Sequence, residues 1–537
     1  MSPTYRKYQS LWRGLLIGTA PAALLFAIDP AVAQTAPSPS SIAQLNSQVQ
    51  VLQQQMQQLQ DQIKAAQSQL SAQQAQQAQQ AQQAQVTPPP PPTTAPSIGG
   101  IQIGGVNLKF GGFAETAGIF RTRNEVADVG SDLNGIPFKN NPRNHESELR
   151  FSARQSRISG LVTGDVDNHT HLSAYAEADF LGASDVSNAR ESNSFLLRMR
   201  HFYGTIDNDT SGGHFLAGQT WSLLTTNTKG IIPRSEQIPL TIDAQYNTGF
   251  NWLRVPQARY VQEFGGGFWG GLSLESPQAL VGGNNPGGTT FANNQANPNA
   301  NNPGDGTGLF SGNQNFTTDT YPDIVGKLAF DPGFGHYELK GALRFFTDRF
   351  NGHNNTNTGG GIGGSAAIPV VPQLLDFQMS GLAGYGIGRY GSSQINDVSF
   401  ATNGSLKPTP EFEALLGLIA HPMAGTDIYV YAGIEQADRT ATSSGVGFGA
   451  ATLNNTTCNA ETAVVGSASA VPACPAVTHR VGEVTLGFWQ DLYKGGFGRV
   501  AVGAQGSYVK KFTFSGVGGA PNVDEGIVMT AFRYYPF

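Results

Sequence analysis

The chain has 537 residues, more than one ordinary soluble domain holds. Charged residues make up 13% and hydrophobic residues 39%, which is too little charge for a typical soluble protein and too few apolar residues for a helical membrane protein. The net charge of −6 argues against nucleic acid as a partner. This composition, with its 67 glycines, favours strands that alternate apolar with small or polar residues and are joined by polar loops.

Residues 1–33 have the pattern of a secretory signal peptide. Basic residues precede a short apolar core at 15–28, and Ala31-Val32-Ala33 forms a small-residue cleavage site. A transmembrane anchor is the alternative, but the apolar core is short for crossing a bilayer. We therefore expect a secreted chain that starts near Gln34.

Residues 34–85 are predicted to form an α-helical coiled coil. Apolar side chains recur at alternating intervals of three and four residues over four heptads. They are Ile42, Leu45, Val49, Leu52, Met56, Leu59, Ile63, Ala66 and Leu70. Because a coiled coil needs at least two chains, this segment predicts an oligomer, although the residue types leave the number of chains open.

Residues 86–104 are predicted to form a linker. Five consecutive prolines at 88–92 and a sixth at 96 favour an extended polyproline II conformation. Such a segment is a stiff spacer between the coiled coil and the rest of the chain.

From residue 105 to 537 the apolar period changes to two. In residues 336–346, Leu339 and Leu343 alternate with Lys340 and Arg344, and strands of about ten residues can cross a tilted bilayer. We predict an all-β fold, a 16-stranded antiparallel transmembrane β-barrel, preceded by the N-terminal coiled coil. The predicted strands cover residues 106–121, 148–161, 171–181, 195–207, 213–221, 248–263, 268–275, 321–331, 336–347, 374–390, 393–401, 410–421, 426–438, 479–490, 497–513 and 525–537.

The connections between these strands alternate between long and short. Long loops outside and short periplasmic turns are typical of outer-membrane barrels. This alternation places both termini in the periplasm and predicts an outer-membrane location, with lipids of that membrane as neighbours. The strand at 393–401 has the weakest pattern and is needed to keep the count even. A secreted, soluble all-β protein is the alternative, and it does not explain the alternation.

Charged residues on the polar side of the strands are expected to line the lumen. A large barrel with a polar interior is a water-filled passage, and selectivity comes from its charged wall. The basic candidates are Arg150, Arg154, Arg157, Arg198, Arg200, Arg254, Arg259, Lys340 and Arg344, and the acidic ones are Glu177, Asp179 and Glu338. A ladder of arginines would attract small anions. The alternative is that the carboxylates neutralise the arginines across neighbouring strands.

Two of these placements depend on bulges. Arg157 has the opposite parity to Arg154, so it faces inward only if a bulge at Gln155–Ser156 turns the strand, and otherwise lies near the interface. Arg254 and Arg259 share a face only if Pro256 marks a bulge.

The loop at 222–247 is more apolar than an exposed loop needs to be. We expect it to fold into the barrel and narrow the lumen, with Lys229, Arg234, Glu236 and Asp243 as its charged residues. The alternative is that its apolar residues pack on a neighbouring subunit.

Cys458 and Cys474 enclose a stretch rich in small residues, and in a secreted chain they are expected to form a disulfide. No catalytic constellation stands out, and His169 and His171 alone are a weak metal signal. We therefore expect no enzyme, no cofactor and no metal.

Four strings of the predicted barrel are distinctive: FSARQSRISG (151–160), AYAEADFLG (174–182), LRMRHFYG (197–204) and GQTWSLL (218–224). They resemble the early strands of the DcaP-like outer-membrane porins of Gram-negative bacteria. The resemblance implies trimeric sixteen-stranded channels, a periplasmic coiled coil and a preference for small anions such as dicarboxylates. It supports Arg154, Arg157, Arg198 and Arg200 as basic wall positions and Glu177 and Asp179 as the acidic strand. Arg533 departs from the pattern, because an apolar residue is expected there.

The sequence thus predicts a homotrimeric porin that passes small, anionic solutes by diffusion. One alternative is a sugar-selective porin, for which Tyr175, Phe202, Tyr429 and Tyr431 could supply aromatic contacts. Another is a structural protein whose stalk tethers the outer membrane to the peptidoglycan of the cell wall.

Overall fold

The computed structural model describes Gln57 and residues 100–182, 195–243, 246–284, 286, 319–350, 353–461 and 474–536, without the side chains of 349–350. The chain divides into two units, residues 1–97 and 98–537. The predicted signal peptide, the coiled coil except Gln57, and the linker up to residue 99 lie outside the described residues. Among those described, no helix is long and apolar enough to span a bilayer.

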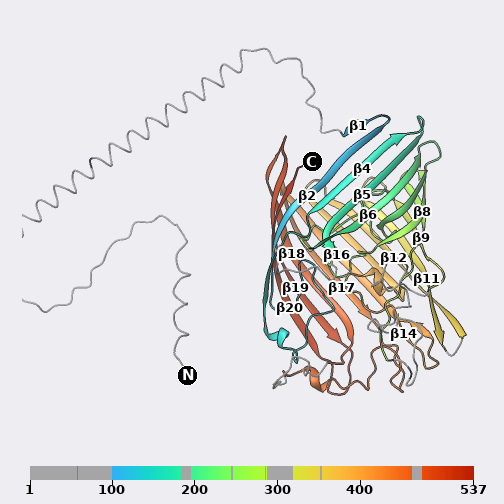
Figure 1. Cartoon of the computed structure of the whole chain (residues 1–537), viewed down its shortest axis with the longest axis vertical. Coiled ribbons are helices and arrows are strands. Elements are labelled where there is room, and N and C mark those ends of the chain that lie inside the picture. The colour runs from blue at the N-terminus through green and yellow to red at the C-terminus, as the bar shows by residue number, and fades with distance from the viewer. Residues whose placement is uncertain are drawn as a thin grey trace, which may run out of the picture. The chain divides into compact units, whose positions relative to one another are not determined.

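The second unit is a closed antiparallel β-barrel (Figure 1). Within the described residues it has sixteen strands. In this count β3 and β4 are one interrupted strand paired with β2, and the short β1, which pairs with the first residues of β2, is left out. The barrel closes where β2 pairs with β20. The strands are β1 (Ile101–Ile103), β2 (Val106–Arg121), β3 (Glu148–Ser152), β4 (Arg157–Asp165), β5 (Thr170–Gly182), β6 (Leu196–Asn208), β7 (Gly213–Trp221), β8 (Arg254–Gly265), β9 (Phe268–Glu275), β10 (Asp323–Phe330), β11 (His336–Phe350), β12 (His353–Val371), β13 (Leu375–Tyr385), β16 (Pro410–Met423), β17 (Thr426–Ala437), β18 (Thr478–Gly495), β19 (Gly498–Thr513) and β20 (Asn522–Tyr535).

The alternation in the sequence determines the two faces of the wall. On β11, Leu339 and Leu343 are exposed on the outside, whereas Lys340 and Arg344 are buried inside. An apolar outer face and a polar inner face are expected of strands that cross a bilayer.

One predicted strand is wrong. Residues 393–401 lie in the loop 386–409, where only the short β14 (Val398–Phe400) and β15 (Leu406–Pro408) pair with each other. The tenth barrel strand is β12, inside the predicted loop 348–373. Its glycines and asparagines lack an apolar alternation, and it is held by continuous pairing with β11 from His353 to Ala367. The two errors cancel, so the strand count is correct.

The connections differ at the two ends of the barrel. At one end they are short: 166–169, 209–212, 266–267, 331–335, 372–374, 424–425 and 496–497. At the other end most are long, the pair β11–β12 being the exception. Figure 1 shows β1 and the end of β20 together at the end opposite the long loops.

The interior is partly filled by long loops. Ile242 and Phe250 of the loop 222–253, and Leu133 of the loop 122–147, join one buried apolar cluster with Tyr429 and Trp489 of the wall. The expectation that the loop 222–247 folds into the barrel is therefore met on the side of β16–β20.

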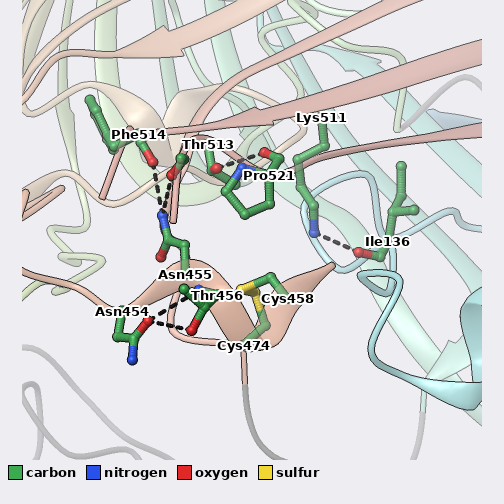
Figure 2. Close-up of a disulfide and its surroundings, with 11 residues drawn as sticks. Ile136, Asn454, Asn455, Thr456, Cys458, Cys474, Lys511, Thr513, Phe514 and Pro521 are labelled. Carbon is green, nitrogen blue, oxygen red and sulfur yellow. Dashed lines mark hydrogen bonds between the residues drawn. A yellow bond between two sulfur atoms is a disulfide. The ribbon is translucent and has the colours of Figure 1, made fainter. Parts of the chain in front are cut away.

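A disulfide fastens the loop that precedes β18. Cys458 and Cys474 are bonded, 16 residues apart in the chain (Figure 2). Beside it, the Asn455 amide donates 3.3 Å to the carbonyl of Phe514, at the start of the last long loop. The ammonium of Lys511 donates 2.6 Å to the Ile136 carbonyl. The first contact connects two long loops, and the second connects the loop 122–147 to β19.

Candidate functional site: the basic wall of the lumen

Four arginines converge on the inner wall formed by β4 to β8, and we call Arg157, Arg198, Arg200 and Arg254 the arginine cluster. Each of the other three lies close enough to Arg254 for their positive charges to repel it. Antiparallel pairing of β5 with β4 and β6 brings Asp179 opposite both Arg157 and Arg198.

A break in the second strand places Arg157 in this cluster. The chain turns between β3 and β4, where the Ser156 amide donates 3.1 Å to the Ala153 carbonyl. The turn directs Gln155 into the barrel, where its amide donates 2.8 Å to the Ile242 carbonyl of the long loop. Of the two possibilities for Arg157, the structure therefore has the bulge.

Two carboxylates on β5 neutralise part of the cluster. Arg198 binds Asp179 through two nitrogens, at 3.0 and 2.7 Å. Arg200 donates to Glu177 and, at 3.0 Å, to Asp179. The contact of Arg157 is longer, because its nearest nitrogen is 3.9 Å from the Glu177 carboxylate. The expected ion pairing is thus present, and three arginines share these two acidic groups.

Two arginines of the cluster also lie close to aromatic rings. Arg254 stacks 4.6 Å above Trp221, and Arg157 lies 5.1 Å from the centre of Phe113. The Nε atom of Arg157 is buried and has no hydrogen-bond partner among the described residues. An unpaired donor in a positively charged wall is suited to an incoming anion.

The same wall carries a group of aromatic side chains. Tyr175 and Tyr203 lie 5.7 Å apart, and His201 is 5.9 Å from Tyr175 and 5.8 Å from Trp221. Arg234 of the long loop donates 3.1 Å to the hydroxyl of Tyr203. The arginine cluster is therefore bordered by rings that contain polar atoms.

Arg150 and Arg154 do not join the cluster. Arg150 is half-exposed and contacts Glu148 at 3.3 Å. Arg154 bonds Asp128 at 2.8 Å and stacks 3.6 Å above Phe195, in a hollow that it shares with the exposed Phe151. The prediction that Arg154 lines the lumen is wrong, because the turn that brings Arg157 inward directs Arg154 away.

The bulge expected at Pro256 is also absent. The β7–β8 register runs without a shift from Gly213 to Trp221, and the irregularity on β8 lies at Glu263–Gly265. Arg259 nevertheless faces inward and is buried, with one guanidinium nitrogen that lacks a partner among the described residues. Arg254 reaches the cluster because it is the first residue of its strand, opposite Trp221.

Lys340, Arg344 and Glu338 hold the structure together and do not face a passage. Lys340 donates 2.7 Å to both the Leu224 carbonyl and the Asn251 side chain. Arg344 is fully buried between Asp323 and Asp397, at 3.1 and 2.8 Å. Glu338 accepts 2.9 Å from Lys327. Strand parity predicted their inward direction, but it could not reveal that loop segments cover them.

The four charged residues of the long loop separate into two pairs. Lys229 and Arg234 are exposed, so their charges are available to a solute. Asp243 is buried and accepts 3.1 Å from the Ser131 amide of the first long loop. One carboxylate oxygen of Glu236 is buried without a partner among the described residues.

Glutamates of the wall hold this loop, and we call them the glutamate anchors. The loop's amide N–H groups donate from Leu223 to Glu275 at 2.8 Å, from Asn227 to Glu338 at 2.8 Å, from Thr248 to Glu483 at 2.8 Å and from Gly249 to Glu435 at 2.7 Å; the Asn251 side chain donates to Glu413. Because these strands lie on different sides of the barrel, the loop crosses the lumen.

Arg533 is an inward charge that the sequence did not assign. It lies opposite Glu115, and their side chains bond at 2.6 Å. Arg533 also stacks 4.3 Å from Trp489. Glu525 and Arg533 have the same parity on β20, and that signal could have shown that this face is the inner one.

Among the described residues, no group of three or more His, Cys, Asp and Glu side chains could hold a metal ion.

The fold is that of the outer-membrane porins. The solved outer membrane channel DcaP of Acinetobacter baumannii has a TM-score of 0.58 and 16% identity, and the match covers 81% of this chain and 99% of that chain. An anion-selective porin from Comamonas acidovorans has a TM-score of 0.43 and 12% identity, over 80% of this chain and 99% of its own. No family model and no curated protein matches the chain. The likeness to DcaP confirms, for the fold, the resemblance found in the sequence.

Proposed function

We propose that the protein is an outer-membrane porin through which small, anionic solutes such as dicarboxylates diffuse. The observation that carries this proposal is the arginine cluster, in which Arg157, Arg198 and Arg200 share Glu177 and Asp179, with Arg254 close beside them. A surplus of positive charge on a low-dielectric wall attracts anions, and a guanidinium matches a carboxylate in shape. The fold shared with the DcaP channel supports a channel role.

The exposed side chains of the long loop extend this basic surface. Arg234 stacks 5.6 Å from Tyr175 and so comes from the loop to the same wall. We expect a solute to pass between the loop and the wall formed by β4 to β6, since apolar clusters hold the loop against β16–β20 and against β8 and β9.

The test is the reversal potential of the full chain in a planar bilayer with a potassium chloride gradient. We expect chloride to be preferred, and Arg157→Gln to reduce that preference. This substitution removes an unpaired donor, while Glu177 keeps its bonds to Arg200 and, at 2.9 Å, to Tyr175. Arg143→Gln, in an exposed position of the first loop, is the matched control. Cation preference at neutral pH would overturn the proposal.

Sugar selectivity is the second candidate, and the group formed by Tyr175, Tyr203 and Trp221 favours it. The other aromatic residues expected for it do not contribute. Phe202 is 64% exposed on the outer face, and Tyr431 is buried beneath the loop, where its hydroxyl accepts 3.2 Å from the Leu240 amide. Tyr429 is likewise fully buried. Liposome swelling with neutral sugars and with dicarboxylates of similar size separates the two functions.

We also propose a homotrimer in the outer membrane, with the segment 34–85 as a periplasmic coiled coil and 86–104 as its spacer. The heptad pattern and the placement of both barrel ends at the short-turn end support this arrangement. Native mass spectrometry of the full chain and of a chain lacking residues 34–97 tests it. Intact trimers and detached membranes after this deletion would instead favour a tether to the cell wall.

A further inference from the structure

The outward face of β16–β19 has a hollow close to the long loops. Its volume is about 450 Å³, and small side chains form its floor: Ala414, Ala432 and Gly482. These residues lie in adjacent rows, because Ile434 pairs with both Ala414 and Gly482, and Ala432 pairs with Leu416 and Val484. The hollow is therefore a gap in the apolar surface that faces the membrane.

Two cations lie at the rim of this hollow. Arg480 is the third residue of β18, and Lys510 is the fourth from the end of β19, so both are at the level where the strands leave the bilayer. Both contact the ring of Phe512, Arg480 at 4.5 Å and Lys510 at 5.3 Å. Pairing of Arg480 with Phe512 and of Gly482 with Lys510 places the two charges side by side on the outer face.

Neither cation has an acidic partner among the described residues. Asp524 is opposite Lys510, but its carboxylate accepts 3.1 Å from Tyr508 and lies 3.8 Å from Arg123. Asp438 accepts from Gln436. Two positive charges therefore remain above an apolar hollow.

We propose that this surface binds a membrane lipid whose phosphate headgroup has a net negative charge, taken from the leaflet on the long-loop side. The phosphate lies between Arg480 and Lys510, and one acyl chain fills the hollow. Phosphate is the natural partner of adjacent guanidinium and ammonium groups. A charged headgroup joined to an apolar chain matches a surface in which cations border an apolar gap. This site is on the outer face of β16–β19, whereas the arginine cluster is on the inner face of β4–β8. The lipid proposal is therefore independent of the proposed selectivity.

The hollow and the cations can be changed separately. A Cβ atom added to Gly482 would meet only one atom, the Gly433 carbonyl oxygen at 3.9 Å, so Gly482→Leu fills the hollow without disturbing the wall. The double substitution Arg480→Gln with Lys510→Gln removes the charges. Lys109→Gln with Lys494→Gln removes two exposed cations near the short turns and is the matched control.

Native mass spectrometry of the full chain in detergent, titrated with phosphatidylglycerol or phosphatidylcholine, tests the proposal. We expect the double Gln variant and Gly482→Leu each to weaken phosphatidylglycerol retention at least tenfold, and the control to retain it. Unchanged retention in either variant would overturn the proposal. Equal retention of phosphatidylcholine would also overturn it, because the site would then not require a headgroup with a net negative charge. Displacement by inorganic phosphate would overturn it too, because the site would then recognise only an ion.

Two further readouts distinguish lipid binding from a subunit contact and from an effect on the pore. Loss of oligomers in Gly482→Leu would show that a second copy of the chain covers the hollow, and the lipid proposal would fail. The reversal potential of the double Gln variant is expected to equal that of the wild type, so the two proposals can fail independently.

Discussion

Replacing Lys340 by Met should release the long loop from the wall of the barrel. The ammonium group donates three hydrogen bonds, to the Leu224 carbonyl and the Asn251 side chain at 2.7 Å each, and to the Ser380 hydroxyl at 2.9 Å. The first two partners lie at opposite ends of the loop, so one side chain fastens both. The methionine has a similar length but cannot donate, and leaves buried acceptors without a partner.

The expected cost follows from this geometry. Leaving a buried acceptor without its donor costs about 1–3 kcal/mol, and each 1.4 kcal/mol is about a factor of ten in an equilibrium constant. The opening equilibrium of the loop should therefore increase by about 10–10²-fold.

Hydrogen exchange of the amides near Leu224 and Asn251 measures this opening, and conductance noise in a bilayer reports it independently. Lys229→Met is the matched control, because Lys229 is an exposed lysine of the same loop. If amide protection near both ends of the loop is the same in Lys340→Met, Lys229→Met and the wild type, the anchoring role of Lys340 is refuted.

Three other predictions concern the loops and the stalk. Burial and the nearby Glu525 carboxylate raise the pKa of Glu125 well above its ordinary value of 4.5. The folded state therefore favours the protonated form of Glu125, and it loses stability as the pH rises above about 4.5. Amide protection in the loop 122–147 should fall between pH 5 and 9 in the wild type and stay level in Glu125→Gln. Joint replacement of Cys458 and Cys474 by Ser should increase proteolysis of the loop 438–477 and leave barrel unfolding unchanged, since the bond closes a 16-residue segment outside the barrel strands; a lower barrel melting temperature would contradict this. Deletion of residues 34–97 should lower the trimer fraction without changing the selectivity of the channel, and a changed reversal potential would contradict it.

The barrel could be predicted from the sequence because its strands alternate strictly in polarity. In β11 every second residue is apolar, so the inward direction of Lys340 and Arg344 followed from parity alone. In β12 the outer face contains glycine and polar residues, and only pairing with β11 makes it a strand. Local pattern cannot detect a strand whose order comes from its neighbour.

Within the site, strand parity predicted which side chains point inward, but it did not predict what surrounds them. It placed Arg198, Arg200, Glu177 and Asp179 on one wall, where the structure has them bonded. It could not show that Lys340 is covered by loop residues that lie 116 and 89 positions earlier in the chain, since such contacts depend on the path of that loop.

The glutamate anchors are consistent with an acidic chain that has the basic passage we propose. The chain carries a net charge of −6, yet Glu275, Glu338, Glu435 and Glu483 each accept a backbone N–H group of the long loop and so point their charge into the loop. On the β4–β8 wall the opposite holds, because guanidinium groups outnumber carboxylates. These buried carboxylates thus hold the loop, and under the proposed function the positive charges that a solute meets are the partly exposed Arg157 and Arg198 and the exposed Lys229 and Arg234. Net charge is a poor guide to selectivity in such a barrel, because many of its carboxylates are covered by loop contacts.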